Sequence, residues 1–306
     1  MRLFLGLDGG QSSTQAALAD ETGRILGRGS AGPADEVNQG PDSTRLRDAL
    51  EGALAAALAA AGLPPETELR AAVAGISGYE GRIYGQPPRI RAGDVTLVHD
   101  TRIAHAGALA GEPGVVVIAG TGSVAYGAGP HGEALTGGWG YLFGDEGSAF
   151  WLARTALMQA MREQDAGESP AFAAAALEAL RMPSLRALSR AFYTGGIDRA
   201  ALAALAPMVL HAAETGDAQA ETIVRDGANA LAIAAMYALR RSALPDTAKV
   251  AIVGGVAQNQ TMVDQFAQRL RALLPQAQPV KPRYGSAEGA LLLAFREAGV
   301  AVSDLT

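Results

Sequence analysis

Residues 94–123, DVTLVHDTRIAHAGALAGEPGVVVIAGTGS, contain two apolar runs that each end in a small polar cluster. The first run, 95–98, ends at His99 and Asp100 and leads into a helix-like segment. The second run, 115–118, leads into a glycine-rich turn. Active sites of open α/β sheets lie at the carboxyl ends of strands. We therefore expect a functional carboxylate at Asp100, beside a second functional turn.

The turn after the second run, 119–123, suits a phosphate group. Its glycines let backbone N–H groups face an anion, and its hydroxyls add hydrogen-bond donors. Similar strand-to-turn junctions occur at 8–14 (DGGQSST) and 254–259 (GGVAQN). None of the three matches a P-loop or a dinucleotide fingerprint, and a single glycine turn is usually a plain chain reversal. Their order and spacing, with Asp100 between the first two, carry the signal.

Composition excludes several functions. The chain has 306 residues, no cysteine and a formal net charge of −6. Without cysteine it has no disulfide, cysteine nucleophile, thiolate zinc site or iron–sulfur cluster on its own thiolates. Without a basic run it lacks the footprint of a nucleic-acid binder. No apolar run reaches the roughly 18 residues of a membrane span, and Met1 leads directly into a strand-like run, so we expect no membrane partner and a cytoplasmic location.

The length predicts two domains, and the pattern predicts that they are duplicated halves. Residues 2–30 read as strand, turn, strand, turn, strand, and residues 115–136 repeat this layout. A packing helix follows at about 44–62, and 69–77 reads as a strand ending in a polar elbow. Further elements are expected in the second half: helices at 147–162, 170–181, 183–193, 197–214 and 218–242, a strand at 249–253, and helices from about 260 and at 285–298.

The stretch GGWGYLFGDEGSAFWLA, 137–153, resembles the signature of the N-acetylglucosamine kinase branch, also called the BadF-type (BadF/BadG/BcrA/BcrD) ATPase family. LGLDGGQSST, VHD, IAGTGSVAYG, VGGVAQN and PRYGSAEGALLLA follow in the family's order, so the resemblance covers nearly the whole chain. The wider pattern is similar to the superfamily of acetate kinase, sugar kinases, heat-shock chaperones and actin.

The resemblance implies an α/β fold with two ribonuclease-H-like (actin-like ATPase) domains, a cleft between them and extra helices on the second. The expected domains are 1–112 and 113–289, with a helix at about 290–306 returning to the first. The implied cofactors are ATP and Mg²⁺, and a homodimer is common in relatives. Gln11 departs from the family, where a glycine is frequent, which bears on the local backbone path.

The family's site residues carry over onto matching positions. Asp8 is the implied Mg²⁺ residue, and Asp100 the implied catalytic base. The implied ATP/ADP-binding residues are Asp8, Gly9, Gly10, Ser12 and Thr14 in the first turn, Thr121, Gly122 and Ser123 in the second, and Gly254, Gly255 and Asn259 in the adenosine motif. The implied sugar-binding residues are Asn38, Ser77, Gly138, Asp145 and Ala149.

Structural explanations for these residues remain open. A strand-end aspartate such as Asp8 or Asp100 often caps a helix or closes a turn, and Asp145 and Glu146 suit the first turn of the next helix. Trp139 and Trp151 are expected in core packing more often than at a sugar, although Trp139 is better placed to shape a pocket. The four histidines have no metal-ligand spacing.

The predicted function is ATP-dependent phosphorylation of an amino sugar, with N-acetylglucosamine giving its 6-phosphate as the first choice and glucosamine as the second. Two alternatives belong to other classes. An ATPase activator of a radical dehydratase would need cluster-ligating cysteines, which this chain lacks. A non-catalytic sugar sensor or repressor would normally add a basic helix-turn-helix segment, whereas this sequence starts with LFLGLDGG after Met1 and Arg2.

Overall fold

The computed structural model describes residues 1–36 and 39–306. Its contacts group the chain into two compact units. Unit 1 consists of Met1–Gly114 and Lys281–Thr306, and unit 2 of Val115–Val280.

The described strands of unit 1 form a five-stranded sheet in the order β3-β2-β1-β4-β5. The first three strands are antiparallel, and β1, β4 and β5 run parallel. Asp8 on β1 pairs with Gly75 on β4, and the next β4 residue, Ile76, pairs with His99 on β5. Asp8 and Asp100 therefore lie at one edge of this sheet, as predicted. The strand bounds are β1 Leu3–Gly9, β2 Thr14–Asp20, β3 Ile25–Ala31, β4 Leu69–Ile76 and β5 Ala92–His99.

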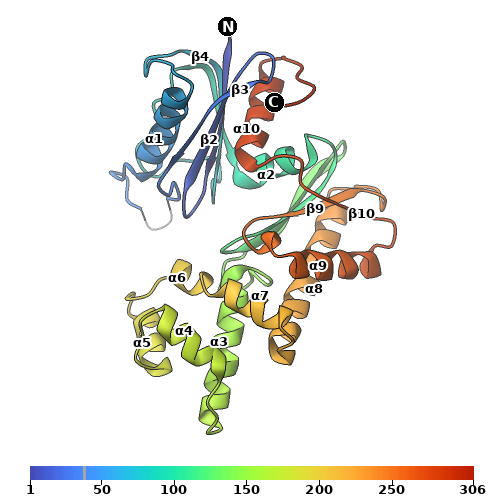
Figure 1. Cartoon of the computed structure of the whole chain (residues 1–306). Coiled ribbons are helices and arrows are strands. Elements are labelled where there is room, and N and C mark those ends of the chain that lie inside the picture. The colour runs from blue at the N-terminus through green and yellow to red at the C-terminus, as the bar shows by residue number, and fades with distance from the viewer. Residues whose placement is uncertain (37–38) are drawn as a thin grey trace. The chain divides into compact units, whose positions relative to one another are not determined.

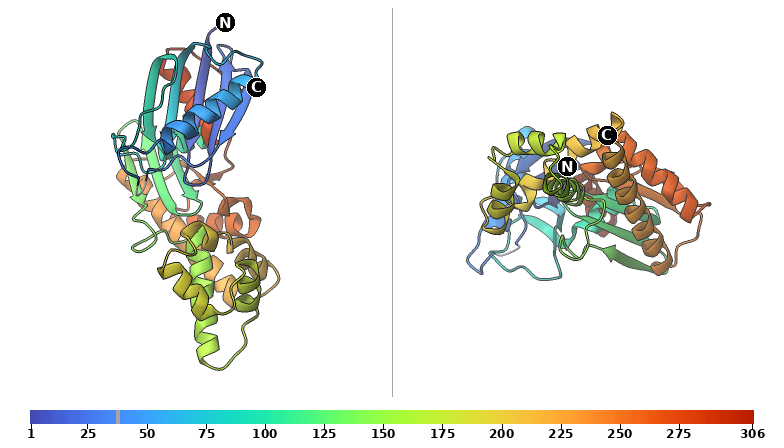
Figure 2. Two further views of the ribbon diagram at one scale, coloured as in Figure 1. Left: turned by 90° about the vertical axis from the view of Figure 1, so that its left-hand side faces the viewer. Right: turned by 90° about the horizontal axis from the view of Figure 1, so that it is seen from below.

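Helices cover both faces of this sheet because β1 is apolar on both sides (Figure 1). Helix α1 (Arg45–Ala60) packs on the face to which β1 contributes Leu3, Leu5 and Leu7. Figure 2, left, shows α1 crossing that face. Helices α2 (Asp100–Leu109) and α10 (Ser286–Glu297) lie on the other face.

The contact between β1 and α10 is close. The rings of Phe4 and Phe295 lie 4.3 Å apart, and a Cβ on Gly6 would lie 2.4 Å from the backbone nitrogen of Leu291. Fully burying a side chain of this size contributes about 1.5–3 kcal/mol. The helix at the carboxyl end of the sequence is therefore part of the core of unit 1.

The described strands of unit 2 form a second five-stranded sheet in the order β10-β9-β6-β7-β8. Taken from β8, this order is the same as β3-β2-β1-β4-β5 in unit 1, so the predicted duplication of the two halves is confirmed. Strand β10, which has three residues including Pro279, was not predicted. The bounds are β6 Gly114–Ala119, β7 Ser123–Gly129, β8 Gly132–Gly137, β9 Lys249–Val253 and β10 Gln278–Val280.

Helices α8 (Ala218–Arg241) and α9 (Gln260–Leu273) share one apolar cluster with this sheet, in which Val117, Leu231 and Phe266 are buried. A short 3-10 helix, η1 (Val256–Gln258), precedes α9. A further apolar cluster is formed by helices α3 Ala149–Asp165, α4 Ala171–Ala179, α5 Leu185–Tyr193 and α6 Arg199–Ala203 (Figure 1). Helix α7 (Ala206–Glu214) instead buries Val209 and Leu210 in the cluster of the sheet.

The single helix predicted at 197–214 is wrong, because the structure has two helices there, α6 and α7. Pro207 lies in the first turn of α7, where its missing N–H does no harm. Inside a continuous helix the same proline would remove a hydrogen bond and clash with the preceding turn. No helix in the described residues combines the length and hydropathy that a membrane span requires.

Candidate functional site

Carboxylates gather at the edge of unit 1. The pKa of Asp8 is raised to about 7. Burial is the largest cause, and the negative charge of Asp100 is the second. A hydrogen bond with Ser286 opposes the shift, and the charge of Glu288 adds to it. Glu288 itself pairs with Arg28. Asp8 therefore lies where a negative charge is poorly solvated and repelled by its neighbours.

The residues of this cluster fit a bound Mg²⁺, because two carboxylates lie close together. A divalent cation removes the repulsion between Asp8 and Asp100, and Mg²⁺ is usually held by one or two carboxylates, waters and substrate phosphates. No group of three or more candidate metal-binding side chains occurs in the part of the chain that the structure describes. Mg²⁺ at Asp8 stays a prediction, with waters and nucleotide oxygens as its remaining ligands.

His99 fixes the position of Asp100. Its Nδ1 lies 2.9 Å from the Asp100 carboxylate, and this hydrogen bond raises the pKa of His99 while burial opposes the rise. The same Nδ1 lies 3.3 Å from the backbone nitrogen of Thr101, where the tautomer without a proton on Nδ1 would cap α2. With the proton on Nδ1, His99 donates to Asp100 and orients a carboxylate that is 25% exposed.

The first turn joins β1 to β2. The Gly10 N–H donates to the Ser13 carbonyl at 3.0 Å, and the Gly10 carbonyl accepts from Ala34. Ser12 is exposed, whereas Thr14 is fully buried and its hydroxyl donates to the Gly32 carbonyl at 2.8 Å. Thr14 thus stabilises the turn from inside the protein. The accessible part of the predicted phosphate site is at Gly10 and Ser12.

The predicted sugar residues of unit 1 are Ser77 and Asn38. Asn38 lies outside the described residues. The Ser77 N–H donates to the Gly9 carbonyl at 2.9 Å, which ties the polar elbow after β4 to the first turn. Ser77 also lines a hollow of about 350 Å³, a size typical of small-molecule sites. In its wall, Glu36 accepts from the N–H groups of Tyr84 and Gly85.

In unit 2, the second turn is bonded to the loop before α3. The Gly120 N–H donates to the Gly122 carbonyl at 2.9 Å, and the Gly120 carbonyl accepts from Ala149 at 2.8 Å. The Ser123 hydroxyl donates to the Glu146 carbonyl at 2.8 Å. A predicted phosphate segment and a predicted sugar segment therefore form one hydrogen-bonded body.

Asp145 has the most unusual environment in that body. Its φ is 62°, in the left-handed region that residues other than glycine rarely adopt, and its side chain is 5% exposed. One carboxylate oxygen accepts from the Ser123 N–H at 3.2 Å, and the other pairs with Arg199. Burial raises the pKa of Asp145, and the Ser123 N–H and Arg199 oppose the rise. Each oxygen still has lone-pair capacity for a ligand hydroxyl.

The loop that contains Gly138 exposes apolar side chains. Gly138 has a φ of 71° and donates to the Ser123 carbonyl at 3.1 Å. Trp139 is 76% exposed and Phe143 83% exposed, so the interpretation of Trp139 as core packing is wrong. Gly138 stays a predicted sugar residue, joined to the second turn through its backbone.

The adenosine motif follows β9. Gly254 has a φ of 101°, and a Cβ there would lie 2.5 Å from the Ala119 carbonyl oxygen at the end of β6. Glycine is therefore required at position 254, where the adenosine motif touches the start of the second phosphate turn. Gly255 faces open space. The Asn259 side chain caps α9 by accepting from Met262 and also donates to Glu214, so its predicted nucleotide role is added to a structural one.

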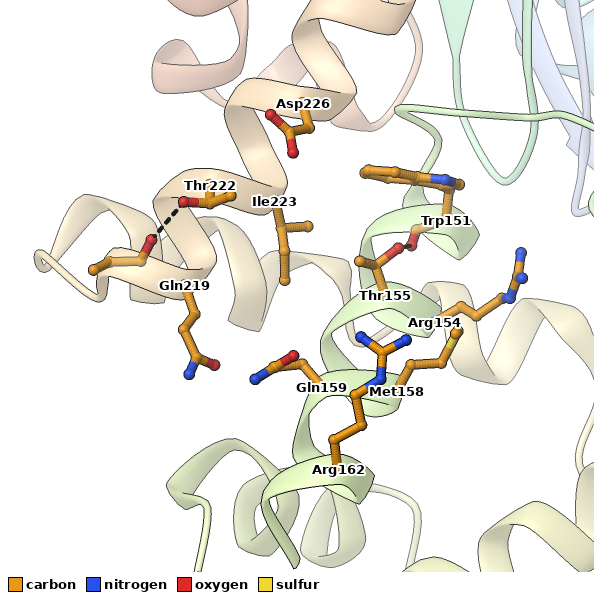
Figure 3. Close-up of a pocket in the computed structure, with 11 residues that line it drawn as sticks. Trp151, Arg154, Thr155, Met158, Gln159, Arg162, Gln219, Thr222, Ile223 and Asp226 are labelled. Carbon is orange, nitrogen blue, oxygen red and sulfur yellow. Dashed lines mark hydrogen bonds between the residues drawn. The ribbon is translucent and has the colours of Figure 1, made fainter. Parts of the chain in front are cut away.

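A hollow of about 520 Å³ lies between α3 and α8 (Figure 3). Trp151, Met158 and Ile223 supply its apolar wall, with Arg162 and Asp226 among the charged residues. None of the predicted site residues lines it. The candidate site therefore comprises the strand edges and turns described above, and this hollow is separate from it within unit 2.

Comparison with known proteins identifies the family. The model of the BadF/BadG/BcrA/BcrD ATPase family matches residues 5–294. The chain belongs to this family. Three known proteins are similar to this chain along nearly its whole length. The N-acetylmuramic acid/N-acetylglucosamine kinase of Clostridium acetobutylicum is 26% identical over 97% of this chain and 99% of its own.

Two solved structures resemble this BadF-type chain. A proposed N-acetylglucosamine kinase from Chromobacterium violaceum superposes with a TM-score of 0.79 at 28% identity, covering 96% of this chain and 99% of its own. A ROK family glucokinase from Streptomyces griseus, in complex with glucose and AMPPNP, has a TM-score of 0.59 at 20% identity, with coverages of 95% and 98%. The latter shows the shared fold alone.

These comparisons confirm the predicted family, the α/β actin-like fold class and a kinase as the kind of enzyme. The individual site residues of this BadF-type protein stay predictions. Sequence reasoning missed Arg199, Ser286 and Glu288. Ser286 and Glu288 belong to the quoted PRYGSAEG segment, so a signal was present. Arg199 has no motif around it, and only the fold brings it to Asp145.

Proposed function

We propose that this chain transfers the γ-phosphoryl group of ATP to a hydroxyl of an amino sugar, with N-acetylglucosamine giving N-acetylglucosamine 6-phosphate as the first candidate. The observation that carries the proposal is the convergence of Asp8 and Asp100 at the edge of one sheet, beside the first turn. A carboxylate for the metal and a carboxylate for the acceptor proton are what phosphoryl transfer to an alcohol requires.

In the proposed mechanism, Asp100 accepts the proton of the attacking sugar hydroxyl, and His99 holds its carboxylate in place. Backbone N–H groups of the first and second turns bind the phosphates, a task that a P-loop gives partly to lysine. Bound Mg²⁺ would neutralise charge on the phosphate oxygens. Most of the catalytic effect then comes from positioning and electrostatic stabilisation, as expected for phosphoryl transfer.

The names of two relatives support an N-acetylated amino sugar. The C. acetobutylicum protein is named for N-acetylmuramic acid and N-acetylglucosamine, and the C. violaceum protein for N-acetylglucosamine. Glucosamine remains the alternative, because one or two side chains decide whether a site accepts an acetyl group or an amine. Ser77 and Asp145 are the described polar side chains proposed to contact the sugar.

The test is ADP release with Mg²⁺ and each of five sugars: N-acetylglucosamine, glucosamine, N-acetylmuramic acid, N-acetylmannosamine and glucose. We expect the highest kcat/KM with N-acetylglucosamine. A higher value with glucosamine would make the chain a glucosamine kinase. Sugar binding without ADP release would instead indicate a sensor, and ADP release that no sugar stimulates would favour an ATPase activator.

The homodimer and the cytoplasmic location remain proposals. The mass in solution tests the first: a homodimer has twice the chain mass of 31.2 kDa. A single-chain mass across a range of protein concentrations would contradict it.

A further inference from the structure

Arg199 joins two parts of the candidate site that are far apart in the sequence. It is the first residue of α6, in the helical insertion of unit 2. Its Nη2 donates to the Asp145 carboxylate and also to the Thr121 carbonyl at 3.2 Å. Asp145 in turn accepts from the Ser123 N–H at 3.2 Å. The guanidinium therefore bridges the second turn and the predicted sugar carboxylate directly.

The surroundings of Arg199 hold it in one orientation. Its side chain is 24% exposed, and its guanidinium carbon lies 5.3 Å from the ring centroid of Tyr141 and 5.6 Å from that of Phe150. Cations over aromatic rings at such distances are attracted by the ring faces. Its Nε is buried and has no hydrogen-bond partner in the described part of the chain.

Gly122 shows that the backbone is built around this ion pair. A Cβ at that position would lie 2.7 Å from Nη2 of Arg199 and 2.8 Å from Oδ2 of Asp145. The second turn therefore approaches the pair as closely as a glycine allows. A merely superficial ion pair would leave space for a side chain there.

We propose that Arg199 is a positioning residue that couples sugar binding to nucleotide binding. The part of this inference that concerns the sugar rests on the proposed function. Arg199 holds the Asp145 carboxylate toward the sugar, and it holds the Thr121 carbonyl in the turn that binds phosphate. A ligand that orders either group orders the other through the shared Nη2, so each ligand increases the affinity for the other. Coupling of this kind is reciprocal.

The variants are Arg199→Gln and Arg199→Lys, compared with Arg186→Gln. Arg186 is an exposed arginine on α5 of the same insertion and makes no ion pair or hydrogen bond through its side chain in the described residues. Three quantities are measured: the Kd of ADP alone by calorimetry, the sugar KM and kcat, and the ratio of sugar Kd values without and with ADP. Melting temperatures show which variants fold.

We expect Arg199→Gln to weaken ADP binding and to raise the sugar KM by roughly 10- to 100-fold, the effect of losing a charge-assisted hydrogen bond. The ratio of sugar Kd values should fall toward one. Arg199→Lys keeps the charge and should lie between wild type and Arg199→Gln, and Arg186→Gln should equal wild type. In a double variant with Asp145→Asn, the second change should add little, because both act through one bridge.

A folded Arg199→Gln protein with wild-type ADP affinity, sugar KM and coupling ratio would overturn the inference, as would a variant that only melts earlier. If Arg199→Gln does not fold, the same readouts on Arg199→Lys decide. If the wild type phosphorylates no sugar, the proposed function fails, and the ADP affinity of the variants still tests the bridge between Arg199 and the second turn.

Discussion

The two units have the same strand order, yet the carboxylates at their sheet edges are balanced differently. In unit 1, Asp8 faces the like charge of Asp100, and its pKa rises to about 7. In unit 2, the Asp145 side chain is 5% exposed and is paired with Arg199 and a backbone N–H. The duplicated fold thus provides one edge that needs an external cation and another that carries its own. We propose that the first edge holds the metal and activates the nucleophile.

The largest expected effect tests the role of the unit 1 edge. Asp100→Asn should lower kcat by roughly 10²- to 10⁴-fold, because the amide cannot take up the proton of the attacking sugar hydroxyl. ADP affinity should stay near wild type. Steady-state kinetics and calorimetry measure the two quantities. Asp94→Asn is the matched control, since Asp94 is an exposed β5 residue that pairs with Arg70 on the surface.

Retention of near wild-type turnover by Asp100→Asn would remove the base assignment. The contrast between the two edges would then need another explanation.

The next effect concerns the unit 2 edge and should appear mainly as lost stability. Gly122→Ala places a methyl group against Arg199 and Asp145, and overpacking of this kind costs about 1–3 kcal/mol. For a domain of this size, each kcal/mol lowers the Tm by roughly 2–4 °C. Thermal melts of Gly122→Ala and Gly120→Ala give the comparison, because a Cβ at Gly120 meets nothing within 4 Å. Equal melting temperatures for the two variants would show that the ion pair yields without cost.

A third test compares the charges at the two edges directly. The pKa of Asp8 is raised from 3.8 to about 7, so between about pH 4 and pH 7 the folded protein retains a proton that the unfolded chain has lost. Stability from this group is present below that window and is lost as the pH rises through it. Asp8→Asn should therefore raise the Tm of the Mg²⁺-free protein at pH 8 and change it little at pH 4. Melts in a chelator at both pH values measure this.

Asp145→Asn is the matched variant. The pKa of Asp145 is also raised, but the Ser123 N–H and Arg199 oppose that rise, so Asp145→Asn should raise the Tm at pH 8 less than Asp8→Asn does. Equal increases in Tm at pH 8 for the two variants would show that the two edges do not differ in charge balance.

Much of the fold could be predicted because its signals are local. Apolar runs that end in glycine turns located β1, β6 and β9, and Asn259 located the start of α9, whose cap it forms. The break between α6 and α7 also had a local signal, Pro207, which the alanine-rich pattern around it concealed. The strand β10 had none, since three residues with a proline show no alternation.

The site could be predicted where its residues follow strands, as Asp8 and Asp100 do. The bridge by Arg199 could not, because an arginine at the start of a short helix is an ordinary surface residue in sequence. Its partners, Thr121 and Asp145, are reached only after the helical insertion has folded back toward β6 and β7. The raised pKa of Asp8 likewise depends on Ser286 and Glu288, which α10 contributes.

The position of α10 has a consequence for synthesis on the ribosome. Residues 281–306 are made after the whole of unit 2, so one face of the unit 1 sheet, with Phe4 and Val73, lacks part of its cover while unit 2 is being synthesised. During that interval the amino-terminal half exposes apolar side chains that α10 covers in the finished protein. The first unit to be translated is thus the last to be completed.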